Sequence, residues 1–268
     1  MWDLLIEPLS FGFMRNAIAT AVLIGILSAV VGSYLIVQQM GMISGVISHA
    51  ILPGLSIAFF LQINLSIGAF IAGVISALFV AIIQNQSRLK VDAAMALILS
   101  SFMALGIILI TLLKTNQIDL SHILFGDILG VRPTDVWQTL IITLVVLLFT
   151  KVFYKELLFY TFDPLGAQAS GLPVKGIYFG LICAITLTIV ASMQTVGVLL
   201  VISLLVGPAS TAYLLVKELH EMMILGALFG VISSVAGMYL SYYLDVPSGA
   251  AIVMVISSLF LLAFSFSR

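Results

Sequence analysis

One histidine stands inside a long apolar run of this chain and is the first candidate for chemistry. His49 lies in the segment S-G-V-I-S-H-A-I-L-P-G at 44–54, and Pro53 follows it by four positions. Proline removes a backbone donor and clashes with the carbonyl four residues earlier, which here is that of His49. A neutral imidazole can ligate a metal ion or relay a proton through its ring nitrogens. The segment therefore predicts a kinked helix with an ionisable ring at the kink.

Two interpretations of His49 remain open from its position alone. Ionisable groups at membrane depth are costly, so by default they are functional and face a protein interior or water. The alternative is a histidine that hydrogen-bonds a neighbouring helix and only holds packing. In the functional interpretation, Ser44 and Ser48 add hydroxyls, and the His49 carbonyl is left without its helical donor. We expect such a set to be a weak, oxygen-rich site for a divalent ion.

The composition excludes a soluble protein. Hydrophobic residues make up 62% of the 268 residues and charged residues 8%, whereas a soluble domain carries roughly 25% charged residues. The net charge of −1 provides no electrostatic footprint for nucleic acid. Cys183 is the only cysteine, which excludes an internal disulfide and a cysteine-rich metal site.

Apolar runs of about 20 residues, the length that a bilayer core demands, recur along the chain. They predict an all-α integral membrane protein of about nine transmembrane helices, or eight, in a single domain over residues 1–268. The predicted spans are 17–37, 43–61, 66–84, 93–113, 136–153, 176–193, 196–216, 222–243 and 250–266. Residues 114–132 are too polar and too short to span, and we expect a partly buried or re-entrant segment there.

Other candidate sites are weaker. Asp119 and His122 could bind a metal, but two such residues near a surface are more often a solvated turn, because a closed site needs more ligands. His220 stands next to Glu221 and close to Glu218, which indicates a solvated face. The chain lacks the G-x-x-x-x-G-K-[ST], G-x-S-x-G and H-E-x-x-H patterns. We therefore predict no catalytic residues and no tightly bound cofactor.

A second proline interrupts a predicted span in the other half of the chain. Gly207-Pro208 lies within 196–216, and Ser203, Ser210 and Thr211 supply hydroxyls for the carbonyls that proline frees. Interrupted spans at corresponding places in two halves indicate a transport pathway.

The connection between the fifth and sixth spans predicts a short surface helix at 163–171. Asp163 can cap a helix whose first residue is Pro164, and Gly171 can end it. A short capped helix of small residues can dock into a cleft of a partner, and the alternative is an ordinary loop helix.

Five stretches, in order along the chain, resemble the zinc/manganese permease family of bacterial ABC importers. They are S-H-A-I-L-P-G at 48–54, D-A-A-M-A-L-I-L-S-S-F-M-A-L-G at 92–106, F-D-P-L-G-A-Q-A-S-G-L-P at 162–173, V-G-V-L-L-V-I-S-L-L-V-G-P-A-S-T-A at 196–212, and D-V-P-S-G at 245–249. The resemblance implies a type II importer-like permease in the plasma membrane that dimerises and passes a divalent metal at the dimer axis.

The same resemblance implies two partners, a cytoplasmic ATPase that binds ATP and an extracytoplasmic metal-binding protein. Residues 163–171 would be the coupling helix that sits on the ATPase. Manganese is the first expectation for the transported ion, with zinc or iron as alternatives. A secondary transporter driven by an ion gradient, with His49 as proton relay, and a non-transport scaffold are the competing functions.

The chain departs from the family at one position that matters. The family has an aspartate four residues before the histidine, where this chain has Gly45. Residues i and i+4 share a helix face, so the family pair would point at one metal together. His49 is therefore the only metal-site residue that the resemblance carries over.

Lysine and arginine predict the orientation, because cytoplasmic loops carry the excess of basic residues. The basic side holds Arg88, Lys90, Lys151, Lys155, Lys175, Lys217 and Arg268, and the other side holds Arg15, Lys114 and Arg132. We expect single cysteines placed at 88 or 217 in a Cys183→Ser background to resist a membrane-impermeant thiol reagent in sealed cells, and cysteines at 119 or 245 to react. Strong labelling at 88 or 217 would refute the orientation.

Overall fold

Long apolar runs become helices in this chain because a backbone in lipid has to satisfy its hydrogen bonds within its own segment. The computed structural model describes residues 7–113 and 126–266, and within these ranges the regular structure is helical. The elements are α2 (Gly12–Val37), α3 (Ile43–Phe60), α4 (Leu65–Gln86), α5 (Val91–Leu112), η1 (Ile128–Gly130), α7 (Pro133–Val152), α8 (Tyr154–Phe162), α9 (Pro164–Ala169), α10 (Val174–Leu215), α11 (Leu219–Leu244) and α12 (Ser248–Phe266).

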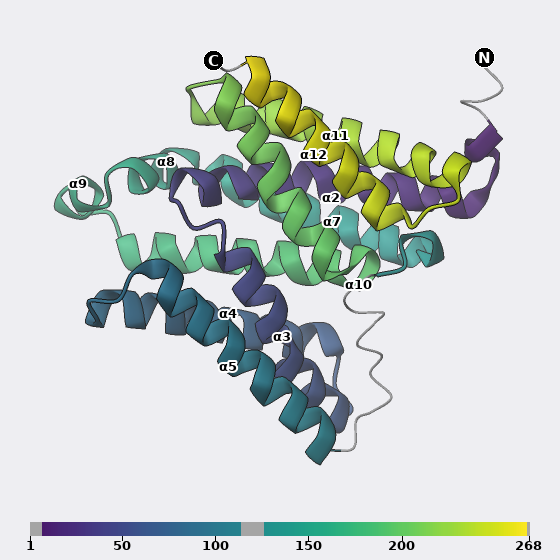
Figure 1. Ribbon diagram of the computed structural model, residues 1–268. Helices are drawn as coiled ribbons and strands as arrows, with labels where there is room; N and C mark the ends of the chain where they lie inside the picture. Colours follow the sequence, from purple (N-terminus) through teal and green to yellow (C-terminus); the bar gives the residue numbers. More distant parts are fainter. Residues whose placement is uncertain (1–6, 114–125, 267–268) are drawn as a thin grey trace.

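Eight of the described helices are long and apolar enough to cross a membrane. The longest, α10, has 42 residues and contains one non-helical residue, Gly197, with φ 78° and ψ 162°. Figure 1 shows the second half of α10 turning away from the first at this point. The predicted spans 176–193 and 196–216 are therefore the two halves of α10, and counting them separately gives the nine predicted segments within the described ranges.

The helices form two groups (Figure 1). In the first group, α3 packs against α4 and α5. In the second, α2 packs against α10 and α11, and α12 lies on α10 and α11. The first half of α10 runs between the groups and contacts α3 and α4 as well as α2 and α7. The His49 helix thus belongs to one group and faces the other.

Two glycine pairs let helices cross at close range, which is how membrane helices associate when no hydrophobic force drives them together. A Cβ on Gly25 of α2 would lie 2.8 Å from the Gly230 carbonyl oxygen of α11. Between α3 and α4, a Cβ on Gly54 would collide with the Gly68 carbonyl oxygen, and one on Gly68 would collide with that of Gly54. Gly54 therefore fixes the distance between α3 and α4.

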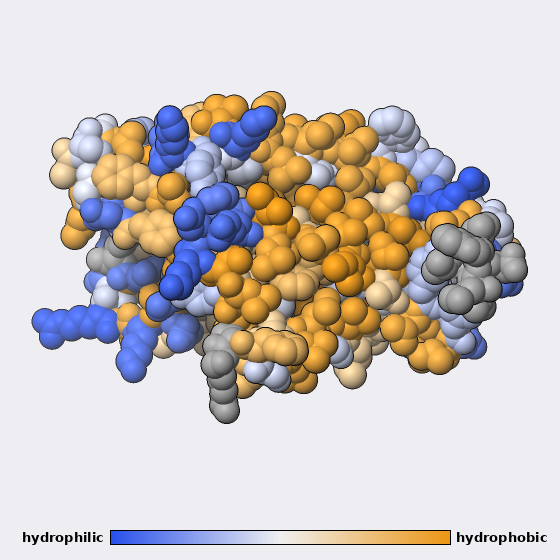
Figure 2. Space-filling model, turned by 90° about the horizontal axis from the view of Figure 1, so that it is seen from above, coloured by the Kyte–Doolittle hydropathy of each residue, from blue (hydrophilic) through white to orange (hydrophobic). Residues whose placement is uncertain are grey.

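The surface has the pattern expected of a membrane protein. Figure 2 shows hydrophobic residues over the middle of the molecule and hydrophilic ones gathered toward its two ends. The apolar surface includes exposed side chains such as Ile141, Leu148, Ile224 and Leu261, which are 58%, 61%, 70% and 62% exposed. Exposed apolar surface of this extent would not be stable in water and is suited to contact with lipid tails or with other membrane helices.

The glycine crossing predicts a difference between two substitutions in α3. Gly54→Ala should lower the free energy of unfolding by about 1–3 kcal/mol, because the methyl group has to push α3 and α4 apart. Gly45→Ala is the matched control, since a Cβ there comes no closer than 4.0 Å to a neighbouring atom, the Ile202 Cδ1. Thermal unfolding of both purified variants in one detergent measures the effect, and equal melting temperatures would contradict the close crossing.

Candidate functional site

His49 lines an open groove of about 950 Å³ on the side of α3 that faces the second half of α10 and α12. Gly45, one turn before His49 on α3, lines the same groove. The opposite wall comes from α10 and α12, and the turn between α2 and α3 closes one end. The polar residues of the lining are Gln39, Ser44, His49, Ser203, Ser210 and Ser257. The histidine thus lies where helices from both groups meet.

The proline after His49 stands inside a continuous helix. α3 runs from Ile43 to Phe60 with Pro53 within it, so the proline does not divide the span. A Cβ on Gly106 of α5 would lie 3.1 Å from Pro53 Cδ, which shows that α5 packs directly on the proline. Because Pro53 has no N–H, the His49 carbonyl keeps a free lone pair in this helix.

The two serines predicted beside His49 have different positions. Ser44 lines the groove, and its Oγ donates to the Gly41 carbonyl oxygen at 2.8 Å. Ser48 is 2% exposed, does not line the groove, and has no hydrogen-bond partner for its Oγ. Of the two predicted hydroxyls, only that of Ser44 therefore lies in the groove that His49 lines.

Hydroxyls from two other helices, α10 and α12, line the groove opposite His49. Ser203 Oγ donates to the Leu199 carbonyl oxygen at 3.0 Å, and Ser257 Oγ donates to that of Val253 at 2.9 Å. Each hydroxyl therefore keeps its lone pairs for a ligand in the groove. Ser257 was missed from the sequence, because nothing in the α12 pattern distinguishes it from the serine beside it.

The second proline also lies within helical backbone. Pro208 frees the Leu204 carbonyl, yet Thr211 Oγ1 donates to the Gly207 oxygen at 2.8 Å and Ser203 Oγ to that of Leu199. The prediction that these hydroxyls satisfy the freed carbonyl was wrong. The interruption of α10 is at Gly197, eleven positions earlier.

The groove is short of metal ligands. Among the described residues no Asp or Glu lines it, and no group of three or more His, Cys, Asp or Glu side chains is placed to hold a metal. Asp119 and His122 lie outside the described residues. His220 is exposed and lies 3.1 Å from Glu218, as predicted for a solvated face. A single imidazole in an open groove can bind a divalent ion weakly and release it.

The predicted helix at 163–171 is present as α9, with the predicted ends. Asp163 Oδ1 accepts the Gly166 N–H at 2.8 Å, Pro164 is the first helical residue, and Gly171 has φ +85°. Leu165 on this helix is 79% exposed. A short capped helix on the connection between two spans can serve as an interaction surface.

Comparisons with known proteins agree over nearly the whole chain. The model of the ABC 3 transport family matches residues 10–267. The manganese transport system membrane protein MntC of Halalkalibacterium halodurans is 47% identical over 261 residues, covering 97% of this chain and 89% of the relative. The chelated iron transport system membrane protein YfeD of Yersinia pestis is 37% identical over 268 residues, covering 100% and 90%.

A solved structure agrees with the fold. A chain of PsaBC from Streptococcus pneumoniae, solved in complex with a Fab, superposes with a TM-score of 0.87 at 39% identity, covering 98% of this chain and 94% of that one.

Proposed function

The chain belongs to the ABC 3 transport family, and from this membership we propose that it is the permease subunit of an importer that moves a divalent transition-metal ion into the cytoplasm. Manganese is the proposed ion, because the relatives named for manganese transport are 39% to 47% identical, whereas the two named for iron transport are 37% identical. The single observation that supports a metal pathway is the position of His49 on the wall of a groove between the two helix groups.

His49 acts in this proposal as a transient ligand. The imidazole provides one ring nitrogen, and the serine oxygens of Ser203 and Ser257 provide weak additional ligands from the opposite wall. A transport site has to bind well enough to admit an ion and weakly enough to let it leave. The absence of a carboxylate from the lining shifts that balance toward release.

Three partners complete the proposed importer. A separate ATPase supplies ATP hydrolysis, because this sequence carries no phosphate-binding loop of its own. An extracytoplasmic metal-binding protein delivers the ion. A second copy of the permease covers the open side of the His49 groove, so that two imidazoles face one pathway. The exposed Leu165 on α9 supports the assignment of 163–171 as the coupling helix that docks on the ATPase.

A gradient-driven carrier is the less favoured alternative. Proton-coupled carriers use carboxylates inside their spans as relays. The buried polar residues of the described chain are serines and threonines, and none is an aspartate or a glutamate. His49 alone would have to carry the proton, which favours the ATP-driven importer.

Replacement of His49 tests the pathway. His49→Ala should lower metal uptake by the reconstituted complex about a hundredfold or more, because even outer-shell partners of metal ligands are worth about 10–100-fold. Expression, folding and ATPase binding should stay near wild type. His220→Ala, which removes an exposed histidine, is the matched control. Normal uptake by a well-expressed His49→Ala complex would contradict the pathway, whereas loss of expression before loss of transport would indicate packing.

A companion variant, Gly45→Asp, restores the family's carboxylate on the face of His49. The backbone there has room for a side chain, since the nearest atom to its Cβ is Ile202 Cδ1 at 4.0 Å. We expect tighter metal binding by calorimetry together with slower turnover, and unchanged affinity would show that His49 does not point into the pathway.

The coupling helix gives an independent test. Gly171→Trp places a bulky L-residue at φ +85°, a conformation that glycine adopts easily and tryptophan does not. We expect ATP hydrolysis to continue while metal uptake per ATP falls severalfold. Gly171→Asn is the control, because asparagine tolerates the left-handed region. The ratio of metal uptake to phosphate release, measured in proteoliposomes, compares coupling in the two variants. Wild-type coupling in the tryptophan variant would disprove docking at this helix.

A further inference from the structure

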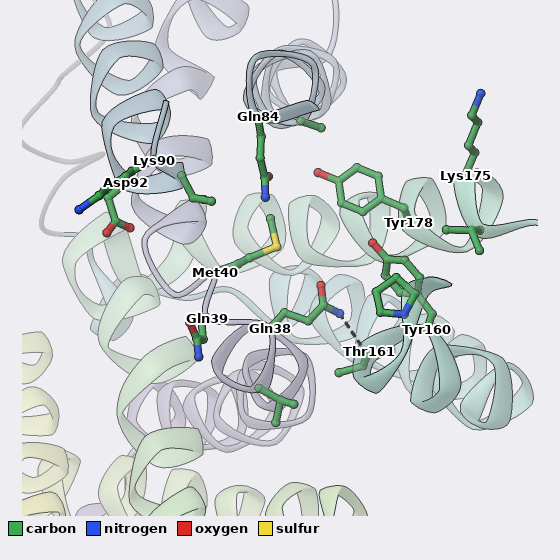
Figure 3. A pocket seen from close by; sticks show the side chains of 15 residues that line it. Gln38, Gln39, Met40, Gln84, Lys90, Asp92, Tyr160, Thr161, Lys175 and Tyr178 are labelled. Atoms are coloured by element: carbon green, nitrogen blue, oxygen red, sulfur yellow. Dashed lines mark hydrogen bonds between the residues drawn. The ribbon is translucent and has the colours of Figure 1, made fainter. Parts of the chain in front are cut away.

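A second cavity, of about 850 Å³, lies at the end of the molecule that carries α9. It is bounded by the end of α2 and its turn into α3, the end of α4, the start of α5, the end of α8, and the first residues of α9 and α10. Figure 3 shows the side chains that line it. Gln39 lines both this cavity and the His49 groove, and the other lining residues are distinct.

The lining is rich in hydrogen-bond donors, which is unusual for a chain of this composition. Two lysines, two other glutamine amides and three hydroxyls contribute from five separate elements: Lys90, Lys175, Gln38, Gln84, Tyr160, Thr161 and Tyr178. Lysine has three donors and no acceptor. Among the residues that the structure describes, Asp92 is the one carboxylate of the lining, so the charged side chains sum to a net positive charge. The natural ligand for such a lining is an anion with several acceptor oxygens.

The polar side chains of the lining occupy its interior and its rim. In Figure 3 the Gln84 amide points into the space between the helices, whereas Lys90, beside Asp92, and Lys175 stand on opposite sides with their side chains extended outward. The Tyr178 hydroxyl faces the same space, is shielded from water, and has no hydrogen-bond partner. An unpartnered hydroxyl in a protein interior is costly, which indicates that a partner for it is missing.

The walls of the cavity are held in place by contacts between elements. Gln38 Nε2 donates to Thr161 Oγ1 at 3.1 Å, which ties the end of α2 to α8. The rings of Tyr160 and Tyr178 meet edge to face with their centroids 6.4 Å apart, which ties α8 to α10. Burial raises the pKa of the Tyr160 phenol, so the group stays a neutral donor at physiological pH. The cavity is therefore preorganised.

Apolar side chains line the cavity next to the donors. They are Val37, Met40, Ala81, Val91 and Val174. The helices α2, α4, α5 and α10 that border the cavity are long and apolar enough to cross a membrane. A ligand in the cavity would thus meet donors at its head and apolar side chains next to its tail.

We propose that this cavity binds a phosphate-bearing anion, and that in the membrane the phosphate belongs to the headgroup of an anionic phospholipid of the cytoplasmic leaflet. Lys90 and Lys175 stand at opposite rims, and their flexible side chains swing inward to neutralise the phosphate, while Gln84 and the Tyr178 hydroxyl donate to its oxygens or to the glycerol of the headgroup. Basic pockets between membrane helices on the cytoplasmic side suit such headgroups. Pro164, the first residue of α9, lines the cavity, so the bound headgroup contacts the helix assigned to ATPase docking.

Lipid binding can be measured on the purified full-length permease, without transport, by native mass spectrometry with dioleoyl phosphatidylglycerol or dioleoyl phosphatidylcholine added. The double variant Lys90→Gln/Lys175→Gln should bind phosphatidylglycerol about 25-fold more weakly, since each lysine near an anionic surface is worth about fivefold. Phosphatidylcholine, which has no net charge, should bind the wild type more weakly than phosphatidylglycerol does, and its binding should change less in the lysine double variant. Lys151→Gln/Lys217→Gln is the matched control, because it removes the same charge from two exposed lysines that do not line the cavity.

A second variant separates the cavity from the surface charge. Gln84→Trp keeps both lysines and fills the space. Because Gln84 is exposed near the end of α4, the substitution should not disturb folding. This variant should also bind phosphatidylglycerol more weakly while keeping the wild-type melting temperature. Equal lipid binding by the wild type, the lysine double variant and Gln84→Trp would overturn the proposal.

Soluble competitors identify the source of the phosphate. Glycerol 3-phosphate and inorganic phosphate should displace phosphatidylglycerol only weakly, because they lack the acyl chains that the apolar residues of the lining would meet. If they bind the wild type in a lysine-dependent manner and phosphatidylglycerol does not, the assignment to lipid is wrong.

Discussion

The structure depends on the requirement that backbone groups at membrane depth find hydrogen bonds inside the protein. Inside the described spanning helices, Gly197 of α10 departs from helical backbone, and this residue is buried. A Cβ on Gly126 would run into the backbone of Val196 and Gly197, so the loop before η1 packs directly on this break. With the break covered by protein, α10 can reverse there. Its second half then lies beside α12 and α3 and becomes a wall of the His49 groove.

The lining of this groove suits the passage of a divalent ion better than its tight binding. In the proposed pathway His49 is the strong ligand, while the hydroxyls of Ser203 and Ser257 donate to carbonyls of their own helices and keep their oxygen lone pairs. Hydroxyl oxygens without a carboxylate hold a divalent ion loosely. The glycine at position 45 removes the carboxylate that the family places one turn away, and it leaves room there. In the proposed dimer, affinity would therefore come from two imidazoles that face each other across the pathway.

Sequence alone predicted the parts of this structure that local chemistry determines. The cap at Asp163 and the left-handed Gly171 were predictable, because both depend on residues within one or two turns. The boundary between the two halves of α10 was predictable from the polar Gln194-Thr195 between apolar runs. The sequence could not show that Ser257 lines the groove and Ser48 does not, because the side of a helix that faces a groove depends on which other helices pack there. A helix that is apolar all round carries no such signal in its pattern.

The turn between α2 and α3 contributes to the lining of both cavities, and its backbone is strained. Gln39 has φ 57°, a left-handed conformation that costs a residue with a Cβ about 1–2 kcal/mol. The same residue lines the His49 groove on one side and the lysine-lined cavity on the other. Its neighbour Gln38 bonds to Thr161, two residues before the cap of α9. Strain of this kind persists where the surroundings hold it in place, and it clusters at functional sites. This strained turn thus lines the groove of the histidine and bonds to α8, which leads directly into the helix proposed to meet the ATPase.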